Sequence, residues 1–552
     1  MSIARVNFLR IIVIVLTIGM VARLWHLQIF EKDFLQDQGD ARTIRMERIN
    51  AHRGIIQDRA GKALAVSTPA LSLWANPQEV LASDADLGPL ATHLGVEASD
   101  FAERLKISES KTFVYLRRHL PPAEARQILE LKISGVYAER EYHRFYPAGE
   151  VAAHLVGFTN VDDKGQEGLE LSFDSWLAGT AGKKKVLKNL YGEIIRDIKP
   201  ISEAQPGKIL TLGIDLRLQY LAYQELKSAV KIFKAKSGSV VVLDVVSGQV
   251  LAMVNQPSYN PNNRLGLDLN AVRNRAVTDV FEPGSTVKPF TVGVALESGR
   301  FIPESTIDTT PGFVRVDDFT VRDPRNRGKI TLGEIIMYSS QVGISKLALD
   351  LNEYDVWGMF EKVGFGNDAG TGFPGESGGY LPNYRRWKNV ERASFAYGYG
   401  LAVTPLQLAA SYLTIASGGI KRDISLIKGG GKNDHRIYSS EVANQLKGML
   451  AAVVIDGTAK KAAIEGYSVA GKTGTVRKMG VSGYEDTRHL AFFAGMAPVK
   501  HPRLVGVVLI NEPKGEKSGG GEVAAPVFSR VMRNALRILN VPPRVQTKGG
   551  SV

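Results

Sequence analysis

Hydrophobic and polar positions divide the chain into three stretches. Residues 8–30 are mostly apolar, and their centre at residues 11–22 carries no charge. Residues 31–200 are mixed, polar and rich in short strand-like pieces, whereas residues 205–540 alternate longer apolar strands with helical stretches. The pattern predicts an apolar N-terminal segment followed by two folded parts, and a length of 552 residues favours more than one domain.

The clearest strands of the larger part come in two pairs. Residues 239–245 form an apolar run that a Ser-Gly turn joins to residues 249–254, which predicts a hairpin. A second hairpin is predicted from residues 489–495 and 504–510, whose connection contains two prolines. Together with the helical stretches, these pairs favour an α+β fold built on a mostly antiparallel sheet.

A helix is expected to close the larger part. Pro526 suits the first position of that helix, because a proline there loses no intrahelical hydrogen bond. Apolar residues then recur at helical spacing and are interpreted as core: Val527, Phe528, Val531, Met532 and Leu536. Residues 541–552 contain prolines and glycines and are expected to form a loose tail.

The N-terminal apolar segment is a candidate membrane anchor. Its uncharged centre suits a cleaved signal peptide as well as a membrane span. We favour an uncleaved anchor, because no cleavage site of small residues follows and the apolar character resumes at residues 24–30. Arg5 and Arg10 would then hold a tail of residues 1–10 in the cytoplasm, with the anchor at residues 11–28 and the bulk of the chain outside.

Composition narrows the possible chemistry. The formal net charge of +13 favours anionic partners such as phospholipid or acidic polymers. Nucleic acid is not expected, since there is no zinc-finger spacing and no basic region leading into heptads. The chain has no cysteine, which excludes disulfides, thiolate catalysis and cysteine-type zinc sites. Its nine histidines include no H-E-x-x-H pair, so no metal site is predicted.

The residues best suited to catalysis lie near Ser285. This serine follows a Pro-Gly turn, and Lys288 lies three positions later in an apolar stretch that ends near Gly299, a plausible helix C-cap. Residues three apart share a helix face, so the serine and lysine would be adjacent. A serine becomes a nucleophile when a base takes its proton, and a lysine can be that base if burial or another cation lowers its pKa.

The same Ser-x-x-Lys spacing occurs three more times, so spacing alone gives four candidates. The other pairs are Ser108 with Lys111, Ser228 with Lys231, and Ser425 with Lys428. Each of these can be a surface serine and lysine on one helix face. Only Ser285 follows a Pro-Gly turn and opens a long apolar helix, which makes it the preferred nucleophile.

A second element, Lys472-Thr473-Gly474 followed by Thr475, is the only Lys-Thr-Gly in the chain. By itself it can be an ordinary glycine-bearing strand edge. Ser-x-x-Lys followed by Lys-Thr-Gly, however, is the signature of serine enzymes that recognise penicillin. On these motifs the chain resembles the penicillin-binding transpeptidases.

Further landmarks extend this resemblance over almost the whole chain. Those typical of the transpeptidase domain are Pro-Ser-Tyr-Asn-Pro at 257–261, Tyr-Gly-Tyr-Gly at 397–400, Thr-Pro-Leu-Gln at 404–407 and Ala-Ala-Pro-Val at 524–527. Two segments resemble the elongated, dimerisation-type pedestal of class B proteins: residues 53–61 and Arg-Phe-Tyr-Pro at 144–147. The resemblance implies a pedestal at residues 29–204 and a transpeptidase domain at residues 205–540. The compact length is more similar to the septal, division-specific type than to the elongation type.

The third family motif, Ser-x-Asn, is represented by Ser339-Ser340-Gln341. Glutamine offers the same amide as asparagine, displaced by one methylene. A displacement of about 1 Å can cost roughly 100-fold in rate where geometry matters. We expect the backbone or the side-chain rotamer to absorb the extra methylene.

The resemblance implies a mechanism without metal or organic cofactor. Ser285 would attack the carbonyl between two D-alanines of a peptidoglycan stem peptide, with Lys288 as base and Ser339 as proton relay. The N–H groups of Ser285 and Thr475 would form the oxyanion hole. Four residues would hold the substrate or its terminal carboxylate: Lys472, Thr473, Gly474 and Thr475, with Gln341 beside them.

The resemblance also implies a location and partners. The protein is expected in the inner (cytoplasmic) membrane as a single-pass protein, with a SEDS-type glycosyltransferase and other division membrane proteins as partners and β-lactams as inhibitors. Three alternatives share its motifs. They are a hydrolase such as a β-lactamase or D,D-carboxypeptidase, an elongation-type transpeptidase, and a non-catalytic division scaffold in which Gln341 marks a decayed site.

Overall fold

The computed structural model describes residues 3–35, 44–83, 85–188, 194–431, 433–480, 483–516 and 518–543. Most of the tail expected at 541–552 therefore lies outside the described residues. The chain forms two compact units, which are Met1–Arg53 with Ala178–Gly207, and Gly54–Leu177 with Lys208–Val552.

The smaller unit contains one long helix and one small sheet. Helix α1 (Ile3–Ile29) is long and apolar enough to cross a membrane. The antiparallel sheet has the order β1-β6-β7, with strands β1 (Ile44–Ile49), β6 (Gly182–Lys188) and β7 (Ile194–Ser202). Arg23 near the end of α1 faces Glu31 at 3.7 Å.

The first part of the larger unit is a sheet with its own cluster of helices. Strands β2 (Ile56–Gln57), β3 (Ala63–Ala75), β4 (Val114–Leu120), β5 (Val136–Phe145) and β8 (Leu210–Thr211) form the sheet. A separate apolar core joins this sheet to four helices: α3 (Pro77–Ala82), α4 (Gly88–Leu94), α5 (Ala98–Ile107) and α6 (Pro122–Leu129). Four short helical segments follow: η1 (Gly149–Val151), α7 (Ala153–Val156), α8 (Gly168–Ser172) and α9 (Asp174–Leu177).

A five-stranded antiparallel sheet is the centre of the rest of the larger unit. Its order is β10-β9-β19-β18-β17. The strands are β9 (Ser237–Asp244), β10 (Val250–Gln256), β17 (Ala470–Gly480), β18 (Gly483–Ala497) and β19 (Leu504–Asn511). Both predicted hairpins are confirmed, as β9 pairs with β10 and β18 pairs with β19. Because β17 is last in the order, its outer edge pairs with no other strand of the described chain.

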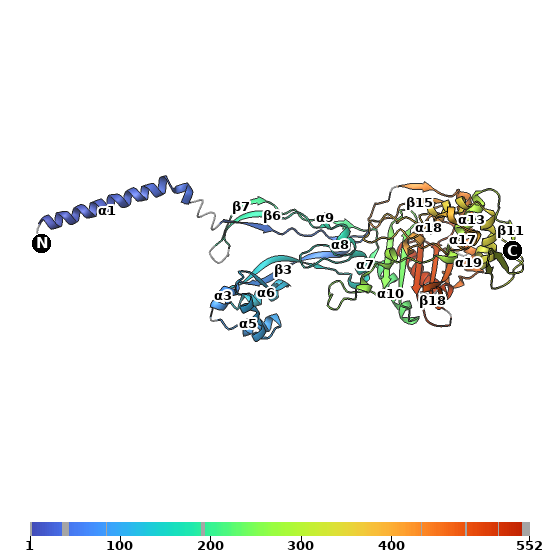
Figure 1. Cartoon of the computed structure of the whole chain (residues 1–552), viewed down its shortest axis with the longest axis horizontal. Helices are drawn as coiled ribbons and strands as arrows, with labels where there is room; N and C mark the ends of the chain where they lie inside the picture. The colour runs from blue at the N-terminus through green and yellow to red at the C-terminus, as the bar shows by residue number, and fades with distance from the viewer. Residues whose placement is uncertain are drawn as a thin grey trace. The chain divides into compact units, whose positions relative to one another are not determined.

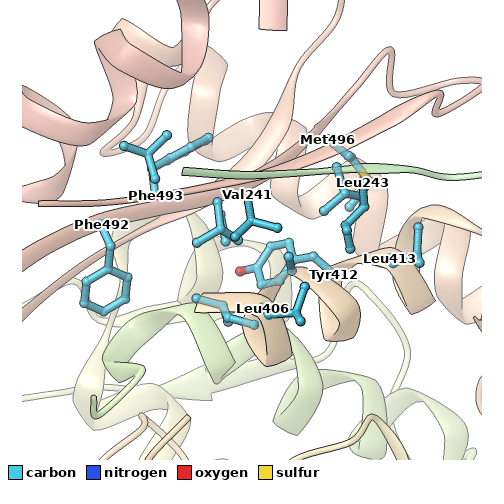
Figure 2. Close-up of a cluster of buried hydrophobic side chains, with 14 of the residues drawn as sticks. Val241, Leu243, Leu406, Tyr412, Leu413, Phe492, Phe493 and Met496 are labelled. Carbon is cyan, nitrogen blue, oxygen red and sulfur yellow. The ribbon is translucent and has the colours of Figure 1, made fainter. Parts of the chain in front are cut away.

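Helices cover both faces of this sheet (Figure 1). Helices α10 (Leu216–Ile232) and α20 (Gly520–Ile538) pack on one face, where the backbone of Gly506 lies against Phe528 and Met532 of α20. Helix α18 (Pro405–Ala416) packs on the other face. Figure 2 shows Tyr412 of α18 among Val241 of β9 and Leu406 of its own helix, in the buried apolar core. Alternating strand residues thus serve the two layers.

The prediction for the closing helix is wrong at its start. Helix α20 begins at Gly520, and Pro526 lies inside it. The turn before Pro526 is held by packing, since Val523, Ala524 and Ala525 are all buried. This burial offsets the one hydrogen bond that proline cannot donate. The apolar residues expected in the core of this helix are buried, as predicted.

The remaining elements surround the sheet and its helices. The helices are α11 (Leu269–Val272), α12 (Arg275–Thr278), η2 (Gly284–Val287), α13 (Lys288–Glu297), α14 (Leu332–Tyr338), α15 (Gln341–Asp350), α16 (Glu353–Lys362), η3 (Tyr384–Arg386), α17 (Asn389–Phe395), α19 (Ser440–Ile455) and η4 (Lys460–Ala462). The strands are β11 (Thr306–Asp308), β12 (Phe313–Val316), β13 (Phe319–Arg322), β14 (Lys329–Thr331), β15 (Ile420–Arg422) and β16 (Asp434–Arg436), paired as β11–β14, β12–β13 and β15–β16.

Candidate active site

Ser285 lies in the tight turn η2, directly ahead of helix α13. Its neighbour Gly284 has a φ of +49° and donates its N–H to the carbonyl of Gly398 at 3.1 Å. A Cβ on Gly398 would lie 2.2 Å from the Gly284 oxygen, so only glycine fits there. From the core below, the buried hydroxyl of Tyr412 donates to the carbonyl of Thr286 at 2.8 Å. The serine is therefore held from two sides by buried contacts.

The predicted catalytic side chains converge on the hydroxyl of Ser339. This hydroxyl donates to Ser285 Oγ at 2.9 Å. It accepts hydrogen bonds from Lys288 Nζ at 3.2 Å and from Lys472 Nζ at 3.1 Å. Lys288 also donates to the Ser339 carbonyl at 2.6 Å. In the described residues no hydrogen bond joins the Lys288 amine directly to the Ser285 hydroxyl, so the Ser339 hydroxyl is the bridge between these two side chains.

Burial lowers the pKa of both lysines. Each has 0% of its surface exposed. Burial lowers the pKa of Lys472 to about 7. Burial, and then the charge of Lys472, lowers the pKa of Lys288 well below its ordinary value, although the charge of Asp323 acts in the opposite direction. A lysine that is neutral near physiological pH is able to accept a proton from a hydroxyl.

Ser339 adopts an unusual backbone conformation. It caps helix α14 with a φ of +62°, in the left-handed region that non-glycine residues rarely occupy. Strain of this kind is found where the surrounding structure fixes a functional residue. Here the conformation lets one residue offer both its hydroxyl and its carbonyl to Lys288.

Asp323 fixes the loop that carries Ser339, and the sequence did not point to it. It follows β13, and its Oδ1 accepts the N–H groups of Gln341 at 2.6 Å and Val342 at 3.2 Å. The Ser340 hydroxyl donates to its Oδ2 at 2.5 Å. A carboxylate on the first N–H groups of helix α15 is favourable for the helix dipole. No local pattern marks an aspartate whose partners come from another element.

Gln341, the residue that departs from the family motif, is the first residue of α15. Its backbone is anchored by Asp323. Its side chain is partly buried, and the described residues offer its amide no hydrogen-bond partner. The amide is therefore available to a substrate.

Lys472, Thr473, Gly474 and Thr475 lie on the edge strand β17. The hydroxyl of Thr473 is hydrogen-bonded to that of Thr458 at 2.8 Å, and Thr475 Oγ1 accepts the N–H of Gly520 at 3.0 Å. A side chain at Gly474 would place its Cβ 2.0 Å from the ring of Phe492. An unpaired strand edge beside a nucleophile offers backbone groups to an extended peptide.

The other Ser-x-x-Lys pairs lie elsewhere. Ser108 caps the end of helix α5, and Ser228 lies on α10. The hydroxyl of Ser425 donates to the carbonyl of Ile427 at 2.9 Å, and Lys428 donates to the carbonyl of Arg59 at 2.9 Å. In the described part of the chain, none of these serine hydroxyls is hydrogen-bonded to a lysine amine.

Glu282 and Tyr484 form a second contact beside the nucleophile that the sequence did not indicate. The Tyr484 hydroxyl, near the tip of the β17–β18 hairpin, donates to the Glu282 carboxylate at 3.0 Å. The N–H of Gly400 donates to the same carboxylate at 3.0 Å. The rings of Tyr399 and Tyr484 meet edge to face at 5.6 Å. We refer to Tyr399 and Tyr484, which lie next to η2, as the aromatic wall.

Similarity to known proteins decides the family. A family model for the penicillin-binding protein transpeptidase domain matches residues 238–533, and one for the penicillin-binding protein dimerisation domain matches residues 48–212. The peptidoglycan D,D-transpeptidase FtsI of Escherichia coli K12 is 42% identical over 537 residues, which cover 96% of this chain and 91% of the relative. The chain belongs to the class B penicillin-binding proteins.

Other relatives of this penicillin-binding protein agree. The probable peptidoglycan D,D-transpeptidase PbpC of Pseudomonas aeruginosa is 41% identical over 549 residues, 98% of this chain and 97% of the relative. A crystal structure of penicillin-binding protein 3 from Mycobacterium tuberculosis, complexed with aztreonam, aligns with a TM-score of 0.70 and 27% identity, covering 90% of this chain and 98% of that chain. The family and fold class predicted from the sequence are confirmed.

Proposed function

We propose that this penicillin-binding protein is a peptidoglycan D,D-transpeptidase that cross-links stem peptides through an acyl-enzyme on Ser285, during septal wall synthesis. The observation that carries the proposal is the meeting of Ser285, Lys288 and Lys472 at the Ser339 hydroxyl. Two relatives support the reaction, one named peptidoglycan D,D-transpeptidase and one named probable peptidoglycan D,D-transpeptidase, and the FtsI relative supports the septal assignment.

In acylation, Ser285 Oγ attacks the carbonyl carbon between the two terminal D-alanines. The Ser339 hydroxyl, which lies between Ser285 and Lys288, turns to accept the Ser285 proton and passes its own proton to neutral Lys288. The C–N bond then breaks, and the same hydroxyl returns the proton to the leaving amine of D-alanine. The N–H groups of Ser285 and Thr475 stabilise the oxyanion of the tetrahedral intermediate.

The substrate is held on the β17 side of the site. Charged Lys472 and the hydroxyls of Thr473 and Thr475 bind the terminal carboxylate, and the Gln341 amide binds a peptide carbonyl. In the second half-reaction an acceptor amine attacks the ester, loses its proton to Lys288, and releases Ser285 Oγ–H. A β-lactam follows the first half-reaction and remains on the serine.

Covalent labelling tests the site assignment. Ser285→Ala should abolish labelling by a fluorescent penicillin, whereas Ser108→Ala, Ser228→Ala and Ser425→Ala should label like the parent. Mass spectrometry of the labelled parent should place the adduct on Ser285. An adduct on another serine sinks the assignment, and the absence of any stable adduct favours the division scaffold. Rapid turnover of the label favours a hydrolase.

The same proposal includes the topology. Residues 1–10 form a cytoplasmic tail, α1 anchors the chain through residues 11–28, and the pedestal (29–204) and transpeptidase domain (205–540) lie outside the inner membrane. The apolar character of α1 supports the anchor. N-terminal sequencing of the membrane-bound protein should return the first residues of the chain, and a start near residue 25 or later would mean a cleaved signal.

A further inference from the structure

A cluster of exposed cations borders the candidate site. It comprises Arg322, Arg325, Arg327 and Lys329, and we refer to residues 322–329 as the basic loop. The loop connects β13 to β14. None of the four cations forms an ion pair within the described part of the chain. A charged loop of this kind is usually just solvated, so its position and surroundings decide whether it has a role.

Two contacts place the basic loop beside the catalytic serines. Asp323, the only acid in the loop, is bonded to the hydroxyl of Ser340 and to the N–H of Gln341. The guanidinium of Arg327 stacks on the ring of Tyr338 at 3.6 Å. Tyr338 directly precedes Ser339 in the chain. The loop is thus fixed to both sides of Ser339, and the stacking orders one of its cations.

The acids near the loop already have partners. Asp323 is used by the backbone of α15. Asp317 accepts the N–H of Val390 at 3.1 Å, and Asp318 faces Arg315 at 3.9 Å. Asp308 accepts the N–H of Thr310 at 2.8 Å, and hydrogen bonding from Thr310 is the main cause of its lowered pKa, with smaller contributions from the charges of Lys346 and Lys329. The loop therefore presents a positive field to whatever occupies the neighbouring site.

We propose that the basic loop binds the free side carboxylates of the stem peptide, so that the enzyme prefers acidic stem peptides over amidated ones. This inference rests on the proposed transpeptidase function and names the chemistry of its substrate. The stem peptide carries carboxylates upstream of the D-alanine pair when it is not amidated. Arginine pairs with carboxylates through two parallel N–H bonds, which suits Arg325 to this task. Lys472 serves the terminal carboxylate, whereas the basic loop serves those further along the peptide.

Two matched peptides test the proposal with the full-length protein. Both are stem pentapeptides ending in D-alanyl-D-alanine, one with free side carboxylates and one with carboxamides in their place. The measured quantity is the ratio of their second-order rates of D-alanine release. Because the ratio is taken within each protein, a partly folded variant does not distort it.

The variant Arg325→Gln/Lys329→Gln should lower this ratio by about threefold or more, the size expected for the loss of two exposed ion pairs. Added salt should lower the parent ratio and lower the variant ratio less, because exposed charges are screened and the variant keeps only two of the four cations. The matched control is Lys106→Gln/Lys111→Gln, two exposed cations in and after helix α5. It should keep the parent ratio.

The outcomes separate this proposal from the function on which it rests. An unchanged ratio in the loop variant, with both peptides turned over by the parent, overturns the basic-loop assignment alone. An equal fall in the control also overturns it, since net charge would then be the cause. A parent that releases D-alanine from neither peptide contradicts the proposed function itself. Arg325→Glu/Lys329→Glu with a preference for the amidated peptide supports the assignment.

Discussion

At Ser339, one hydroxyl serves a nucleophile and two buried amines. The context of the motifs was enough to single out Ser285, Lys288 and Lys472 as candidates, because only this Ser-x-x-Lys follows a Pro-Gly turn and the sequence has one Lys-Thr-Gly. It did not reveal that Ser339 bridges them, since that depends on a left-handed backbone at the end of α14. Asp323 was not predicted, because the partners of its side chain come from a different element.

The two lysines predict a bell-shaped pH profile for penicillin acylation. Lys288 must be neutral to accept a proton. Its lowered pKa means that it becomes neutral at a lower pH than an ordinary lysine does. Lys472 must be charged to bind the carboxylate, and it loses its proton as the pH rises through about 7. The second-order acylation rate should therefore rise with pH, reach a maximum, and fall above about pH 7. A rate that still climbs between about pH 8 and 10, in protein shown to be folded by circular dichroism, would contradict this.

We predict that the side-chain amide of Gln341 contributes to the rate of acylation. Asn at this position should acylate at least as fast as the parent, whereas Gln341→Ala and Gln341→Leu should be slower by about 10-fold or more, the worth of a transition-state hydrogen bond. The backbone N–H bond to Asp323 remains in all three, so the loop is kept. Stopped-flow acylation rates check this. Equal rates in parent, Ala and Leu would leave Ser339 alone to represent the third motif.

The hairpins of the central sheet could be predicted from local sequence, whereas the start of helix α20 depends on packing. The strands of the central sheet were predictable because two apolar runs around a short turn leave few other pairings. The start of α20 was not, because its glycines at 519–521 suggest a loop. In the fold they allow close approach instead, since a Cβ on Gly520 would lie 2.4 Å from the carbonyl oxygens of Gly474 and Phe492.

The end of hairpin β12–β13 braces the catalytic loop, which gives a prediction at this scale. Asp323→Ala removes three hydrogen bonds to residues 340–342 and should slow acylation by about 10-fold or more. Asp317→Ala is the matched control, because it removes a carboxylate from the same hairpin that is bonded to α17 rather than to the loop. Acylation rates and thermal unfolding are measured together. If the two variants acylate alike, Asp323 has no positioning role.

For the molecule as a whole, the family and the apolar N-terminal helix could be predicted from the sequence, because both rest on patterns that can be recognised without knowledge of contacts. The small sheet of the smaller unit is built from segments far apart in the sequence, with β1 paired to β6. This pairing could not be predicted from the sequence. Short polar strands carry little periodicity, and their partners lie far away in sequence.

A class B protein has no glycan polymerase of its own, and α1 is long and apolar enough to cross a membrane. We therefore predict a complex with a multi-pass SEDS-type glycosyltransferase, made through residues 11–27 and the pedestal. Replacing both regions with unrelated sequence should abolish co-purification, and replacing α1 alone with another apolar helix should weaken it. Recovery of the polymerase at parent level with both regions replaced would rule the interface out.

The glycine at position 398 has a consequence for drug resistance. A resistant enzyme must disfavour the antibiotic while it still cross-links the wall, and small changes around the nucleophile are one route to this. Position 398 cannot change in this way, because any side chain there collides with the backbone that holds Ser285. Ser285 reacts with antibiotic and peptide alike. Escape variants should therefore gather at the aromatic wall of Tyr399 and Tyr484, where side chains can change while the turn beneath them stays intact.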